Sequence, residues 1–137
     1  MSKAIRDIIH RHSIFSLLPD NTQNELAGIG KTFLFKAKEK LIREGKFNPY
    51  LFLLINGTVE IESPNETPIT ISGHKILGEI SATGMGSPVA DVIATSHVIA
   101  IAFPVDVIAN VLTKHDNFAK RIRDLGMKQA EHYFTSS

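Results

Sequence analysis

The sequence predicts a mainly β protein with helical ends, and three observations predict it. Eight short runs rich in β-branched and aromatic residues occupy the middle of the chain, residues 31–103. Glycine, proline and asparagine residues of the kind found in turns separate these runs. On both sides of this region, apolar residues recur at three- and four-residue steps, which indicates helices. Many short strands at this spacing are typical of a sandwich or a barrel and not of βαβ units.

The first thirty residues are expected to be helical. Ile5, Ile8 and Ile9 lie three or four residues apart, so one side of the first helix is apolar. Pro19 separates it from a second, shorter helix, which is expected to end near Gly30. This opening segment ends where the period of the pattern changes from helical to strand-like.

The strand region follows from Lys31. The expected strands are 32–36, 40–44, 51–55, 58–62, 68–72, 75–80, 90–96 and 97–103. In the run TVEIE, glutamates alternate with valine and isoleucine, which predicts one wet face and one dry face. Asn56-Gly57 stands between two such runs, and this dipeptide predicts a tight hairpin joining 51–55 to 58–62.

After Pro104 the pattern is helical again, first over 105–112 and then over about 117–133. On the last helix, a narrow stripe at three- and four-residue steps is formed by Phe118, Ile122, Leu125, Gln129 and Tyr133. The stripe has two interpretations that can coexist. It packs back onto the β region, or it pairs with a protein partner or with a second copy of the chain.

Length and charge narrow the possible functions. The 137 residues fit one domain, with N-terminal helices over 1–30, strands over 31–103 and C-terminal helices over 104–134. Fifteen basic against fourteen acidic residues give a net charge of only +1, which argues against a nucleic-acid-binding surface.

The sequence lacks cysteine and shows no secretory or membrane-spanning segment. It has no cysteine, so disulfides and thiol chemistry are excluded. Its start lacks the apolar core of a secretory signal, and its longest apolar stretch, 98–112, is too short to span a bilayer. We therefore expect a cytoplasmic protein without a membrane partner.

Several short features occur in the order found in one known family. They are Phe15 and Leu18-Pro19; Leu41-Ile42-Arg43-Glu44-Gly45; Leu51 to Leu54 followed by Asn56-Gly57-Thr58-Val59-Glu60-Ile61; Gly73; Leu77-Gly78-Glu79-Ile80; and Ala90-Asp91-Val92-Ile93-Ala94. In this order the chain resembles the cyclic nucleotide-binding domain family from about Phe15 to Leu125. The resemblance implies an eight-stranded antiparallel jelly roll, a double-stranded β-helix, flanked by helices. It also implies a non-catalytic regulatory module with cAMP or cGMP as its possible ligand.

In that family a short helix begins at a Gly-Glu pair and aims its amides at the cyclic phosphate. The resemblance places this phosphate-binding cassette at Gly78 and Glu79, with Ile80 and Ser81 supplying further amides. The glutamate accepts a hydrogen bond from the ribose 2′-hydroxyl. An arginine about nine residues later pairs with the phosphate, and a small or hydroxyl residue follows it.

The cassette lacks that arginine. Its position falls at Pro88, or at Ser87 with a shift of one residue, and Val89 follows. No realignment restores it, because no arginine occurs between Arg43 and Arg121. Loss of a desolvated charge partner costs about 2–5 kcal/mol, or about thirty- to several-thousand-fold in affinity.

Two hypotheses follow from this departure. The first is a sensor that still accepts a cyclic nucleotide or a related small ligand and signals by repositioning its C-terminal helices. The second is a scaffold for protein–protein contact or dimerisation that binds no nucleotide, with its pocket closed by Met85, Pro88 and Val89.

Other chemistries find little support. The six histidines are scattered, and no His-x-His pair with a glutamate lies within a strand, so we expect no metal site. The Gly84 to Val89 segment fits neither a dinucleotide fingerprint nor a nucleophile elbow. No catalytic set of residues can be argued, and we expect that the protein is not an enzyme.

Overall fold

The computed structural model describes residues 2–64, 66–84 and 86–135, and its architecture is the predicted roll with helical ends. The helices are α1 (Ser2–Arg11), the 3-10 turn η1 (Phe15–Leu17), α2 (Asp20–Ile29), α3 (Glu79–Ala82), α4 (Val105–Lys114) and α5 (Asp116–Thr135). The strands are β1 (Lys31–Phe35), β2 (Lys40–Ile42), β3 (Tyr50–Asn56), β4 (Thr58–Glu62), β5 (Ile69–Ser72), β6 (Ile76–Leu77), β7 (Asp91–Ala94) and β8 (Val98–Pro104).

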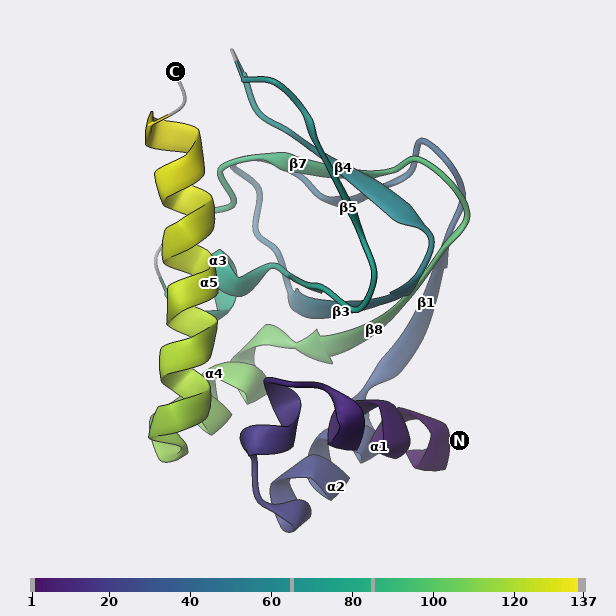
Figure 1. The fold of residues 1–137 in the computed structure, drawn as a ribbon, viewed down its shortest axis with the longest axis vertical. Helices are drawn as coiled ribbons and strands as arrows, with labels where there is room; N and C mark the ends of the chain where they lie inside the picture. The colour runs from purple at the N-terminus through teal and green to yellow at the C-terminus, as the bar shows by residue number, and fades with distance from the viewer. Residues whose placement is uncertain (1, 65, 85, 136–137) are drawn as a thin grey trace.

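Two four-stranded antiparallel sheets form the roll (Figure 1). Their strand orders are β1-β8-β3-β6 and β2-β7-β4-β5. Helices α1 and α2 lie together below the first sheet in this view, and α5 stands along one side of the roll. The eight-stranded roll that the resemblance implied is therefore confirmed.

The hairpin predicted at Asn56-Gly57 is wrong. β3 pairs with β6 and β8, and β4 pairs with β5 and β7, so the turn passes from one sheet to the other. Both edges of β3 are already occupied, which leaves no edge for β4. Gly57 is still required, because its φ is +94° and a Cβ atom there would lie 2.2 Å from the carbonyl oxygen of His97.

The first sheet has a core on each of its faces. One cluster fills the interior of the roll and includes Phe52 and Leu54 of β3. The other joins the helices to the opposite face of the same sheet and includes Leu51 and Leu53. β3 is therefore buried on both sides, which explains why its sequence is a continuous apolar run and not an alternating one.

The first turns of α5 belong to this helical core. Phe118 and Ile122 are fully buried, and the Phe118 ring lies 5.5 Å from that of Phe15, centroid to centroid. The packing interpretation of the apolar stripe thus holds for these two side chains. None of the helices within the described ranges is long and apolar enough to cross a membrane.

Candidate functional site

The cassette begins where β6 ends, at Gly78. Its backbone is left-handed, with φ +92° and ψ 14°, a conformation that favours glycine. A Cβ atom would lie 2.7 Å from Nδ2 of Asn48 and 2.8 Å from the carbonyl oxygen of Tyr50. Conformation and space therefore both require glycine at this position.

Asn48 is the residue against which Gly78 packs, and the sequence pattern did not single it out. Its side chain is buried; Nδ2 donates to the carbonyl oxygen of Tyr50 at 2.8 Å, and Oδ1 accepts from the Tyr50 amide at 3.2 Å. The only sequence signal was Asn48-Pro49, which reads as an ordinary turn. Its role depends on a contact with a segment thirty residues away, which local patterns do not reveal.

Glu79 opens the short helix α3 and is the most unusual side chain of the site. Its exposed fraction is 0%, and neither carboxylate oxygen has a hydrogen-bond partner among the described residues. Burial raises the pKa of Glu79 to about 7, a shift that an interaction with its own backbone amide only partly opposes. Near neutral pH this carboxyl group is therefore divided between its protonated and ionised forms.

The end of α3 is held by Thr83. Its amide and its Oγ1 both donate to the carbonyl oxygen of Glu79, at 3.0 and 2.9 Å. Ile80 lies within α3, but its side chain is outside the described part of the structure. Ser81 is partly buried and faces a cavity of about 430 Å³ between α3, α4 and α5.

This cavity brings one cation to the cassette. Arg123 of α5 lines it together with Ser81 and Gly84, and Asp106 of α4 lines it as well. Among the residues that the structure describes, none of those lining this cavity belongs to a strand, so the cavity lies on the helical side of α3. Arg123 is exposed on its surface and has no ion pair within the described ranges.

The second half of the predicted site follows Met85, which lies outside the described residues. Ser87 is exposed, whereas Pro88 and Val89 are partly buried. Val89 packs against the core inside the roll, and the carbonyl oxygen of Pro88 accepts a hydrogen bond from the Gly45 amide at 2.9 Å. No basic side chain stands at these positions, so this segment offers a phosphate only neutral groups.

Asp91, the first residue of β7, follows this segment and is held by β2 and by the loop after it. Lys40 donates to Asp91 Oδ2 at 2.9 Å, and the Glu44 amide donates to Oδ1 at 2.7 Å. These two hydrogen bonds, the amide first, lower the pKa of the Asp91 carboxyl group. Since the next residue, Val92, faces the interior of the roll, Asp91 and its partners lie on the outer surface.

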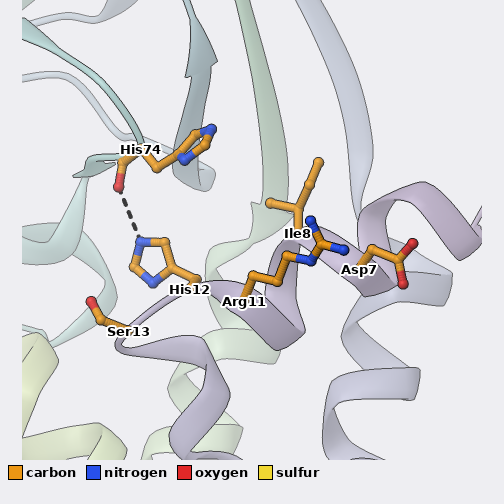
Figure 2. Close-up of a pocket in the computed structure, with 6 residues that line it drawn as sticks. All are labelled: Asp7, Ile8, Arg11, His12, Ser13 and His74. Atoms are coloured by element: carbon orange, nitrogen blue, oxygen red, sulfur yellow. Dashed lines mark hydrogen bonds between the residues drawn. The ribbon is translucent and has the colours of Figure 1, made fainter.

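The turn that leads into the cassette is fastened to the end of α1. Figure 2 shows the hydrogen bond between the ring of His12 and the carbonyl oxygen of His74, which measures 3.0 Å from Nε2. Nδ1 of the same ring accepts from the amides of Ile14 and Phe15, at 3.1 and 3.4 Å. These partners assign the neutral tautomer with hydrogen on Nε2.

Burial is the main reason why the pKa of His12 is lowered, and the adjacent His74 ring lowers it further, while the hydrogen bond to the His74 carbonyl opposes both. The ring also lines a cavity of about 340 Å³ that includes Arg11 and Asp7 of α1 (Figure 2). No group of three or more metal-ligating side chains occurs in the part of the chain that the structure describes.

The sequence matches a known protein family over more than half of its length. The family model of the cyclic nucleotide-binding domain matches residues 32–115, which run from β1 through α4. The chain belongs to the cyclic nucleotide-binding domain family. A search of the curated proteins gives no match.

Solved structures of the same fold include kinase regulatory subunits and a bacterial sensor. The regulatory subunit of a cAMP-independent protein kinase A from Trypanosoma brucei has a TM-score of 0.79 at 17% identity, over 98% of this chain and 50% of that one. The sensor domain of the transcriptional regulator DNR from Pseudomonas aeruginosa has a TM-score of 0.77 at 17% identity, over 96% of this chain and 99% of that domain. The regulatory domain of Toxoplasma gondii protein kinase A with cAMP gives 0.74 at 16% identity, over 96% and 50%.

The chain therefore spans about half the length of the two kinase subunits and nearly all of the bacterial sensor domain. A further structure is a mutant of the Trypanosoma subunit, bound to cAMP in its A site, with a TM-score of 0.66 at 17% identity over 90% and 53%. In it a glutamate is changed to alanine, a threonine to arginine, and the valine next to that threonine to alanine. At these identities the likeness establishes the fold.

Proposed function

We propose that residues 1–137 form one non-catalytic regulatory module of the cyclic nucleotide-binding family that binds cyclic nucleotides only weakly. The observation that carries this proposal is the contrast between the two halves of the cassette. Glu79 is present as an unpaired hydrogen-bonding group, whereas Ser87, Pro88 and Val89 supply no positive charge. The ribose contact is retained, and the charged contact to the phosphate is not.

In this proposal the amides from Gly78 to Ser81 and the Glu79 carboxylate are the remaining ligand contacts. The 2′-hydroxyl of a cyclic nucleotide donates to the carboxylate, whose oxygens have no hydrogen-bond partner among the residues that the structure describes. The cyclic phosphate, with one negative charge, enters a segment whose side chains from 76 to 96 sum to −2. The missing cation accounts for a loss of about 2–5 kcal/mol relative to a cassette that has it.

The Trypanosoma structures support this interpretation by analogy. The Trypanosoma kinase is described as cAMP-independent, and the mutant of its regulatory subunit that is bound to cAMP carries an introduced arginine followed by an alanine, together with a glutamate changed to alanine. Pro88 and Val89 of the present chain form a comparable neutral pair at the position that the resemblance gives to the arginine. In this proposal the absence of a positive charge at this point of the roll is what weakens cyclic nucleotide binding.

The output of the module is the packing of its C-terminal helices. α3 contacts both α4 and α5 directly, and Ala82 of α3 is buried in the same cluster as Phe118 and Ile122 of α5. A ligand that moves α3 therefore changes how α5 packs, which is a shift between two populated arrangements. The signal passes to a protein partner or to a second copy of the chain, in the cytoplasm, and involves neither nucleic acid nor a membrane.

A second candidate function is a scaffold that binds no nucleotide at all. The complete burial of Glu79 favours it, because a ligand reaches the carboxylate only after the structure opens. Four aromatic rings inside the roll also pack together, with Phe33 5.0 Å from Tyr50 and 6.1 Å from Phe52, centroid to centroid. In this case the roll serves only to present its helices to a partner.

Titration of cAMP and cGMP into 15N-labelled protein distinguishes the two functions. The weak sensor gives amide shifts in residues 78–90 that saturate at millimolar nucleotide, together with changes in α4 and the first turns of α5. Glu79→Ala removes these shifts, whereas Lys36→Ala, at an exposed lysine outside the cassette, retains them. No response at these concentrations contradicts the sensor and leaves the scaffold.

A further inference from the structure

The loop between β2 and β3, residues 43–49, contains the most exposed large apolar side chain among the described residues. Phe47 is 82% exposed. A single exposed ring needs no explanation on its own. This one, however, forms a wall of two cavities, one of about 160 Å³ on the β2 side and one of about 430 Å³ on the β8 side.

The smaller cavity is strongly basic. Lys40, Arg43 and Lys46 line it, and no acidic side chain in the described part of the chain does. The chain as a whole has a net charge of only +1, so three cations around one small cavity are a local concentration of charge. Phe47 and Pro49 supply the apolar part of its lining.

Two of the three cations are free to meet a ligand. Lys40 is already paired with Asp91, at 2.9 Å. Arg43 and Lys46 have no ion pair within 4.0 Å among the described residues, although Arg43 contributes to the potential at Asp91. Glu44 lies in the same loop but does not line the cavity, and its amide donates to Asp91.

The loop is also held in place before any ligand arrives. Asp91 fixes its start through the amide of Glu44 at 2.7 Å, and Gly45 donates to the carbonyl oxygen of Pro88 at 2.9 Å. A turn closes between the amide of Lys46 and the carbonyl oxygen of Arg43, at 3.2 Å. Little backbone ordering is therefore needed when an anion binds between these residues.

We propose that the β2–β3 loop is a second anion site, which takes the phosphoryl group of a phosphomonoester between Arg43 and Lys46. A phosphomonoester carries close to two negative charges at neutral pH and several acceptor oxygens, and these match two unpaired cations. The ring of Phe47, at the rim of the cavity, packs against the apolar or aromatic part of the same ligand.

This site is separate from the cassette and goes beyond the function proposed above. It lies at the outer end of β2, whereas the cassette residue Glu79 is sealed inside. The hydrogen bond from Gly45 to Pro88 connects the two regions. A ligand on the loop therefore acts on the same segment that the cyclic phosphate would approach.

NMR titrations with inorganic phosphate and with phenyl phosphate test the proposal on the full chain. Both ligands are expected to shift amides of residues 40–49, and phenyl phosphate is expected to bind more tightly. Replacing both Arg43 and Lys46 by alanine should weaken binding at least about tenfold. Lys46→Ala alone should also weaken it, whereas Lys36→Ala, a matched loss of one exposed lysine, should not. Phe47→Ser should remove the advantage of phenyl phosphate and leave the affinity for inorganic phosphate unchanged.

Equal weakening by Lys36→Ala and Lys46→Ala overturns the site and indicates a general effect of net charge. Unchanged binding in the double variant also overturns it. Equal affinity for the two ligands in the wild-type protein overturns the role of Phe47. Each variant is first compared with the wild type by thermal unfolding. Because Arg43, Lys46 and Phe47 are exposed, their replacement should leave the unfolding temperature nearly unchanged. The variant Glu79→Ala separates this result from the proposed function, because it should remove the response to cAMP and retain the response to phenyl phosphate.

Discussion

Replacing Glu79 by glutamine should remove a pH dependence from the stability of the fold. The wild-type carboxyl group is fully buried and has no hydrogen-bond partner among the described residues, so its ionised form is strongly disfavoured in the folded state. Glutamine has nearly the same shape and does not ionise. It introduces a buried amide whose cost is the same at every pH, so only the change with pH carries information.

The sign and size of the effect follow from the shift in pKa. The pKa of Glu79 is about 7 in the folded protein and 4.5 for a free side chain, so the folded state binds the proton more tightly. The stabilisation is complete below pH 4.5 and is lost as the pH rises through 7. Since one pH unit corresponds to about 1.4 kcal/mol, the loss is about 3 kcal/mol.

Urea denaturation of both proteins at pH 4.5 and at about pH 8 measures the difference. The free energy of unfolding of the wild type should fall by about 3 kcal/mol relative to Glu79→Gln over this range. The opposite contributions of His12 and Asp91 are present in both proteins and cancel. A difference between the two proteins that stays constant within about 0.5 kcal/mol would refute the burial of an unpaired carboxyl group at this position.

Three further predictions concern the scaffold around the site. Gly78→Ala should destabilise the fold by about 2–5 kcal/mol in urea denaturation, because it adds left-handed strain to a clash with Asn48. Gly73→Ala, at φ +83° with open space around it, should cost only the strain of about 1–2 kcal/mol, and equal losses would contradict the close approach. His12→Ala should lower the free energy of unfolding by about 1–3 kcal/mol at pH 8. Because the pKa of His12 is lowered in the folded protein, the wild type is more stable than the variant above pH 6.5 and loses this advantage at lower pH. A thermal unfolding series in which the advantage grows toward pH 5 would be inconsistent with the neutral tautomer. Asp91→Ala should cost about 1 kcal/mol at neutral pH, an effect lost as the pH falls below about 3.8, and faster amide exchange of the loop 43–49 should accompany it.

The strands and helices were predictable because their signals are local. Turn residues separate the β runs, and the alternation in TVEIE shows which side chains of β4 face inward. Strand pairing was less accessible. Asn56-Gly57 indicates a hairpin locally, yet both edges of β3 pair with strands more than twenty residues away.

The properties of the site itself depend on distant contacts. The absence of an arginine near Pro88 can be read from the sequence, but the isolation of Glu79 cannot, because it results from how α3 packs. The same holds for Asn48 beneath Gly78 and for Asp91 between Lys40 and Glu44, in which the partners are about thirty to fifty residues apart. Patterns within one segment do not reveal which side chains will lack a partner after folding.

The affinity of Pro88→Arg for cAMP, measured by calorimetry beside the wild type, shows whether the missing positive charge is what limits cyclic nucleotide binding. Proline at this position uses only its carbonyl group, which accepts from Gly45, so the change adds a guanidinium group without removing a donated hydrogen bond. We predict that Pro88→Arg binds cAMP at least about thirtyfold more tightly than the wild type, from a gain of about 2 kcal/mol or more. Ser87→Arg covers the alternative alignment. Tight binding of cAMP by the wild-type protein, with no gain in either variant, would contradict the account.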